Sequence, residues 1–250
     1  MNENLYNFVI GLADDALILG QRLSELCSNG PYMEEDLALT NTALDYIGRA
    51  SLFYQYASEI SDKDCTENDL AYLRNEREYT NLLINELPNG DFAFTMCKQY
   101  FLDVFYRLYL EKLMQSSDEH LAAIAAKSIK ETNYHLKRSE QWMRQLALGT
   151  DESLHRLQVA IEEIQDYTNE LFKMSDDEQA LVEDGISVDR TSLLADWKQH
   201  VNSHFVSLGL SELDDTRTIE GGRNGIHTEH LGHILSEMQF IQRAYPGQEW

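Results

Sequence analysis

The sequence has 250 residues, 43% of them hydrophobic, which is enough apolar material for one large domain or two small ones. Its formal charge of −23 opposes general binding to nucleic acid or to an anionic membrane, although a local basic patch could still hold one phosphorylated ligand. The sequence has no signal-peptide pattern, no membrane-length apolar run and no C-x-x-C pair, so we expect a cytoplasmic protein without disulfides or a cysteine-based zinc site.

Apolar residues recur at steps of three and four along most of the sequence, which predicts long amphipathic helices and an all-α fold. The prolines, Pro31, Pro88 and Pro246, lie where this pattern stops. The helices expected in chain order cover residues 3–28, 34–60, 69–87 (as one or two short helices), 91–115, 118–147, 151–174, 189–208 and 225–243.

Two stretches each predict a pair of antiparallel helices joined by a short connection, residues 3–60 and 91–147. These two αα-hairpins are the natural halves of a four-helix bundle, with the remaining helices packed outside it. The sequence therefore predicts a single ferritin-like domain over residues 1–250, with additional peripheral helices.

Both hairpins carry acidic residues at the spacing of a di-iron site. In the ferritin-like arrangement, two helices each supply one Glu and the other two each supply Glu-x-x-His. Here Asp14 or Asp15 is followed by Asp45 in the first hairpin, and Asp103 is followed by Glu131 in the second. The second arms read Asp45-Tyr46-Ile47-Gly48 and Glu131-Thr132-Asn133-Tyr134, so both lack the histidine. The motif predicts an incomplete site and no metal in this chain.

Two interpretations of these acids follow. A bare buried carboxylate is costly, so Asp45, Asp103 and Glu131 are expected to pair with protein groups such as Lys130 or His135. The alternative is a divergent metal-dependent oxidase that is active on its own and uses the three acids with His135.

Two histidine clusters leave a metal role open. His200 and His204 have the i,i+4 spacing that can place both rings on one helix face, but no Glu follows His200 as in the H-E-x-x-H motif. His227, His230 and His233 drift around a helix axis, which strains ligation of one ion. Packing and hydrogen bonding are the simpler interpretation of both clusters.

Several segments together carry a family resemblance. These segments are residues 12–17, 36–39 with 43–45, 75–83, 87–93, 125–131 with 134–136, 225–232, 237–239 and 246–250. In these segments, and over essentially its whole length, the sequence resembles the C subunits of multicomponent phenylacetyl-CoA epoxidases.

This resemblance implies a structural, non-catalytic, ferritin-like subunit of a hetero-oligomeric oxygenase. Its implied partners are a homologous catalytic A subunit that holds the di-iron centre, a reductase subunit with FAD, an iron–sulfur cluster and NADPH, and small accessory subunits. The complex would epoxidise the ring of phenylacetyl-CoA with O₂ in aerobic phenylacetate degradation. Whether the single chain is an enzyme therefore stays open at this point.

The resemblance also implies contacts with the CoA ligand at two stretches, residues 78–81 and 179–181. The alternative is that both stretches are ordinary helix-end surface, and a further alternative is a free-standing helical protein that binds an acyl-CoA. The residues concerned are Glu78, Tyr79, Thr80, Asn81, Gln179, Ala180 and Leu181.

Overall fold

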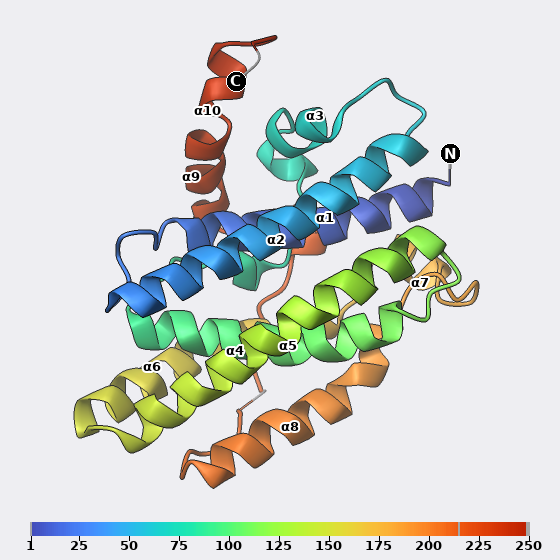
Figure 1. The fold of residues 1–250 in the computed structure, drawn as a ribbon. Coiled ribbons are helices and arrows are strands. Elements are labelled where there is room, and N and C mark those ends of the chain that lie inside the picture. Colours follow the sequence, from blue (N-terminus) through green and yellow to red (C-terminus); the bar gives the residue numbers. More distant parts are fainter. Residues whose placement is uncertain (1, 215, 249–250) are drawn as a thin grey trace. The chain divides into compact units, whose positions relative to one another are not determined.

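The computed structural model describes residues 2–214 and 216–248, and within them every regular element is a helix. The described chain forms two compact units (Figure 1). Unit 1 comprises residues 2–88, 175–181 and 221–248, and unit 2 comprises residues 89–174 and 182–220. The all-α prediction is confirmed, and the single-domain assignment stays a prediction.

Unit 1 is built on an antiparallel pair of long helices, α1 (Glu3–Ser24) and α2 (Met33–Ile60), which lie side by side in Figure 1. The side chain of Asn2 caps α1 by accepting a hydrogen bond from the backbone N–H of Leu5. The helix predicted to reach residue 28 ends at Ser24, and a turn with Ser28 in the left-handed region follows (φ 70°). Most of α1 between residues 8 and 23 is buried, its two adjacent aspartates included.

The segment after α2 is mostly irregular. It contains one short helix, α3 (Glu67–Tyr72), followed by two 3₁₀ turns, η1 (Glu76–Glu78) and η2 (Leu83–Asn85). The sequence predicted one or two helices over 69–87. The backbone N–H groups of Thr80 and Leu82 bond to carboxylates of α1 instead of to carbonyls four residues earlier, so no α-helix continues there.

The rest of unit 1 comes from two later segments. The helix α7 (Asp176–Ala180), which the sequence did not predict, packs on α1, and so does α9 (Glu229–Met238). The helix predicted over 225–243 is shorter and divided: a 3₁₀ turn, η5 (Gly222–Asn224), precedes α9, and α10 (Phe240–Ala244) follows it. The last two residues of the predicted C-terminal motif, 249 and 250, lie outside the described residues.

Unit 2 is built on a second antiparallel pair, α4 (Phe92–Leu113) and α5 (Glu119–Leu148), capped by the side chains of Asp91 and Asp118. The helix α6 (Asp151–Thr168) packs against both. It ends in a 3₁₀ turn, η3 (Asn169–Phe172), which occupies most of the remainder of the predicted 151–174 helix.

The last helix of unit 2, α8 (Leu194–Ser207), follows the 3₁₀ turn η4 (Arg190–Leu193) and packs on α4. Aromatic rings fill this contact: Trp197 lies 5.7 Å from Phe101 and 5.4 Å from Phe172 between ring centroids. The indole N–H of Trp197 donates to the carbonyl of Phe101, so the polar group of this large buried ring has a hydrogen-bond partner. No described helix is long and apolar enough to cross a bilayer.

Candidate functional site

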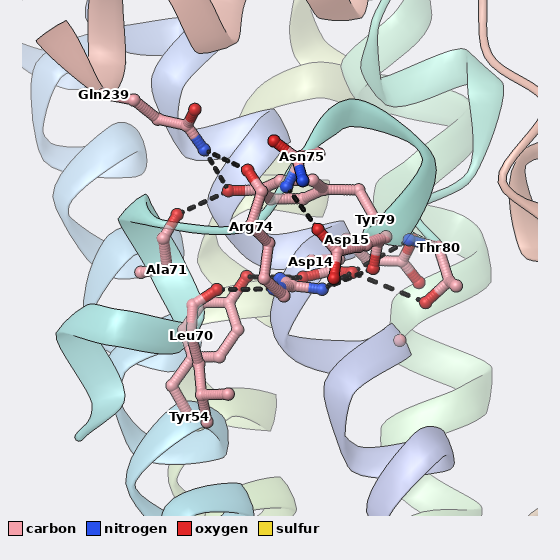
Figure 2. Close-up of polar contacts among 12 residues, drawn as sticks. Asp14, Asp15, Tyr54, Leu70, Ala71, Arg74, Asn75, Tyr79, Thr80 and Gln239 are labelled. Atoms are coloured by element: carbon pink, nitrogen blue, oxygen red, sulfur yellow. Dashed lines mark hydrogen bonds and ion pairs between the residues drawn. The ribbon is translucent and has the colours of Figure 1, made fainter. Parts of the chain in front are cut away.

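A buried carboxylate on α1, that of Asp14, lies at the centre of a polar network in unit 1 (Figure 2). It forms an ion pair with Arg74, which follows α3. Tyr54 of α2 donates its hydroxyl to Asp14 at 2.5 Å, and the backbone N–H of Thr80 donates at 2.9 Å. One carboxylate therefore joins α1, α2 and the irregular segment between α3 and η2.

Arg74 supplies a permanent positive charge to this network. Burial has the largest single effect on the pKa of Arg74 and lowers it, but the charge of Asp14, the hydrogen bond to Asp14 and the neighbouring Tyr54 and Tyr79 together raise this pKa above its usual value. The guanidinium also lies 4.1 Å from the ring centre of Tyr79, in the geometry of a cation–π contact. Burial, followed by the charge of Asp14, raises the pKa of the Tyr54 hydroxyl well above its usual value. Tyr54 is therefore a stable donor at neutral pH.

The neighbouring carboxylate, Asp15, is neutralised by a second arginine from the far end of the sequence. Arg223 of η5 donates to Asp15 at 2.6 Å, and both side chains are almost fully buried. The same guanidinium donates to the backbone carbonyls of Thr80, at 2.6 Å, and Gly11, at 3.2 Å. The backbone N–H of Leu82 completes the set at 2.8 Å from Asp15. Arg223 thus joins three segments of unit 1.

Two glycines allow the backbone around Arg223 to approach so closely. A Cβ atom at Gly222 would lie 2.0 Å from the carbonyl oxygen of Asn81. Gly225 has a φ of +67°, and its Cβ would lie 2.5 Å from the carbonyl oxygen of Arg77. A side chain at either position would push the C-terminal segment away from residues 77–81.

A buried ion pair holds the start of α9. The Glu86 carboxylate accepts hydrogen bonds from Asn81 (2.9 Å) and from the backbone N–H and hydroxyl of Thr228 (2.8 and 2.6 Å). His227 Nδ1 contacts the same carboxylate at 2.6 Å, and its Nε2 lies 2.8 Å from the carbonyl of Tyr79. Because a carbonyl only accepts and Glu86 already accepts three other hydrogen bonds, both ring nitrogens of His227 are donors and the ring is protonated.

The pKa of His227 is consistent with this arrangement. Burial alone lowers it, but the hydrogen bond to Glu86, the charge of that carboxylate and the hydrogen bond to the Tyr79 carbonyl together raise it above its usual value. The α9 helix is therefore anchored by a contact that depends on protonation.

The four residues at 78–81 are engaged in these networks to different degrees. The Tyr79 side chain is fully buried: its hydroxyl donates to the Ala71 carbonyl at 2.6 Å and accepts from Gln239 at 2.9 Å. Asn81 is also fully buried, whereas Glu78 is exposed and Thr80 half-buried. CoA contact at these positions stays a prediction, and only Glu78 and Thr80 have side chains that reach the surface.

The second predicted CoA stretch belongs to the same unit. Gln179 and Ala180 on α7 are exposed, and Leu181 is buried. The helix α7 packs on α1, to which the 78–81 stretch is also bonded through Thr80 and Asp14. Both stretches therefore contact α1, and their contact with CoA stays a prediction.

In unit 2, the buried acid is Asp103 on α4. Gln99 donates to it at 2.6 Å and Ser139 of α5 at 2.8 Å. Lys130, a partner suggested by the sequence, is exposed. Two of the predicted acids, Asp45 and Glu131, are half-buried, whereas full burial was expected. Each lies at the edge of the buried face of its helix. His135 on α5 is buried.

The histidine clusters are engaged with protein groups. His200 lies 2.9 Å from Glu140 on α5, and His204 lies with its ring edge-on to Tyr100, at 5.2 Å between centroids. His227 is paired as described above, while His230 is half-buried and His233 lies further along α9. No three His, Cys, Asp or Glu side chains within residues 2–214 and 216–248 are grouped as metal ligands.

Comparison with known proteins gives the family. Over residues 1–250 the chain matches the family described as phenylacetic acid catabolic protein. It is also 43% identical over 250 residues to the C subunit of the 1,2-phenylacetyl-CoA epoxidase of Escherichia coli (strain K12), with 100% of both chains covered. The chain belongs to the phenylacetic acid catabolic protein family. This family is all-α and ferritin-like, so the predicted fold class is confirmed.

A ferritin-like fold can hold a di-iron centre, and the donor set of this chain does not fit one. In unit 1, the Asp15 carboxylate accepts hydrogen bonds from Arg223 and from the backbone N–H of Leu82. In unit 2, the Asp103 carboxylate accepts hydrogen bonds from the side chains of Gln99 and Ser139. Neither hairpin supplies a histidine at the third step after its second acid, and iron sites of this kind need nitrogen ligands as well as carboxylates.

Reasoning from the sequence missed the cations and the His–Glu pair that organise unit 1. Arg74 lies 60 residues from Asp14, Arg223 lies 208 residues from Asp15, and His227 lies 141 residues from Glu86. No helical spacing relates partners so far apart in sequence. The available signal was the close spacing of Gly221, Gly222 and Gly225 around Arg223, which indicates a tightly packed backbone.

Proposed function

We propose that this chain is the C subunit of a 1,2-phenylacetyl-CoA epoxidase and acts there in a structural, non-catalytic role. The full-length match to the Escherichia coli protein supports the assignment to such a complex. The observation that carries the non-catalytic role is the Asp15–Arg223 pair. At this position a guanidinium neutralises the carboxylate that a di-iron protein would offer to iron.

The other components of the proposal rest on the resemblance to the C subunits of phenylacetyl-CoA epoxidases. A homologous subunit would hold the di-iron centre, and a reductase subunit with FAD and an iron–sulfur cluster would supply electrons from NADPH. This chain would brace the catalytic subunit. It would also contribute to the CoA site through four positions of unit 1 that reach the surface: Glu78, Thr80, Gln179 and Ala180.

The test is co-expression with the genes that neighbour this one, followed by measurement of complex size, iron content and epoxidation of phenylacetyl-CoA. We expect a complex in which iron remains with the partner chain after the subunits are separated. Asp103→Asn in this chain preserves the shape of the side chain and should leave both iron content and epoxidation rate unchanged. The matched control is an Asn substitution at a carboxylate ligand of the iron-bearing partner, which should abolish both.

Two results would contradict the proposal. Stoichiometric iron on the purified single chain, lost in the Asp103→Asn variant, would support an oxidase that is active on its own. Tight binding of an acyl-CoA by the single chain, without any iron-bearing partner at native expression levels, would support a free-standing binding protein.

A further inference from the structure

A groove between α5 and α8 of unit 2 gathers basic side chains on a strongly acidic protein. The positions that line it follow helical steps of three and four on both helices, so one face of each helix forms a wall. Its volume of about 560 Å³ is within the range of small-molecule sites. The lining residues are Lys137, Glu140, Gln141, Arg144, His200, Ser203 and His204.

The single acid of this lining already has a hydrogen-bond partner. Glu140 lies 2.9 Å from His200, and this hydrogen bond lowers the pKa of Glu140 against the raising effect of burial. The charge of Arg107 on α4 lowers it further. In contrast, neither Lys137 nor Arg144 has an acidic partner within the described residues. The groove therefore contains two cationic side chains, Lys137 and Arg144, that form no ion pair with a described residue.

One end of the groove brings several hydrogen-bond donors together. Gln141 and Arg144 line it from α5, and Ser203 and His204 line it from α8. Arg144 is close enough for its charge to affect His204, whose pKa is lowered mainly by burial, so the ring is neutral at pH 7. His204 Nδ1 is buried without a hydrogen-bond partner among the described residues, which leaves Nε2 as the ring nitrogen for a ligand.

We propose that this end of the groove binds the phosphate group of a phosphorylated small molecule. A carboxylate is satisfied by one arginine, which meets both of its oxygens. Here a guanidinium is joined by an amide, a hydroxyl and an imidazole, and such a set matches the three terminal oxygens of a phosphate monoester. The groove is much larger than one phosphate, so the rest of the ligand would extend toward Lys137. The site lies wholly within unit 2 and does not depend on the function proposed above.

The test uses the full chain with inorganic phosphate and pyrophosphate as probes, followed by ³¹P NMR titration at pH 7. We expect saturable binding of both, with pyrophosphate the tighter. Arg144→Gln should weaken it roughly tenfold or more, and Ser203→Ala should weaken it less, because a charged donor contributes more than a neutral one. The matched control is Lys127→Gln, an exposed position on the same helix outside the groove, where the same charge change should leave binding unaltered.

Three results would overturn the proposal. The first is the absence of saturable binding to the wild-type chain. The second is equal weakening by Arg144→Gln and Lys127→Gln, which would show that only net charge matters. The third is competition by acetate or by a short poly-glutamate peptide at least as strong as that by pyrophosphate, which would indicate a carboxylate ligand or an acidic protein surface. Arg144 and Ser203 are both exposed, so their variants should remain folded.

Discussion

Replacing Arg223 by Met should strongly destabilise the C-terminal part of unit 1. The substitution keeps most of the apolar stem but removes the charge that faces Asp15, whose side chain is 2% exposed. Removing one partner of a buried ion pair typically costs about 3 to 5 kcal/mol, because the remaining charge is left buried and uncompensated. Leu82 and Asn85 still donate to Asp15 in the variant, so we expect a loss near the lower end, about 3 kcal/mol.

A double variant separates the ion pair from simple loss of packing. Asp15→Asn combined with Arg223→Met removes both charges of this pair, so the double variant should lose about 2 kcal/mol less than the sum of the two single losses. If packing alone mattered, the two losses would add.

The assay is native-state hydrogen exchange on peptides from α1 and α9, because a chain with two compact units need not unfold in one step. Exposed Arg77→Met in the same unit serves as the control and should leave exchange unchanged. The reasoning would be refuted by a loss below about 1 kcal/mol in Arg223→Met, or by additivity in the double variant.

Three further predictions concern other contacts. Because the folded-state pKa of His227 is raised, the stability from its ion pair is fully present below the unfolded pKa and is lost as pH rises through the folded pKa. Exchange protection of α9 should therefore fall as the pH rises above about 6.5, the ordinary pKa of an unfolded histidine, and an unchanged slope in His227→Gln would contradict this. Gly222→Ala should disrupt unit 1, and this would be measured as lost exchange protection of α9. Gly48→Ala should instead stabilise its helix by up to about 1 kcal/mol, because a Cβ there meets nothing within 4 Å. Similar behaviour of the two variants would exclude the steric argument. Ser139→Ala removes a hydrogen-bond donor from buried Asp103 and should lower the free energy of unfolding by about 1 to 3 kcal/mol. The measurement is denaturant unfolding followed by tryptophan fluorescence. An unchanged free energy of unfolding would show that the other donors to Asp103 suffice.

The long helices could be predicted from the sequence because their signals are local. In α5, the cap residue Asp118 and the apolar residues that follow at steps of three and four lie within one stretch, so the predicted end at 147 differs from the observed end by one residue. The 69–87 region differs because its apolar residues, such as Leu82 and Leu83, are buried in an irregular segment. There, carboxylates of α1 supply the hydrogen-bond partners that a helix would otherwise supply itself.

The candidate site could be predicted only in part, for a related reason. The sequence marked Asp15 and Asp103 as acids that needed compensation, since a carboxylate among apolar residues is costly. It could not identify the compensating groups, because those of Asp15 come from segments more than 60 residues away in sequence. The partners of Asp103, Gln99 and Ser139, are neutral and carry no charge pattern to recognise.

The two arginines of unit 1 compensate the adjacent buried acids of its helical hairpin. A metal ion in such a site would neutralise the carboxylates and join the elements that supply them. Arg74 and Arg223 do both for Asp14 and Asp15: each contributes a full positive charge and also bonds to backbone carbonyls of neighbouring segments. A guanidinium fixes five donors in one plane, so each arginine can bind a carboxylate and a backbone carbonyl at the same time. Asp14 and Asp15 therefore depend on these two cations, because removal of either arginine would leave a buried carboxylate without its charged partner.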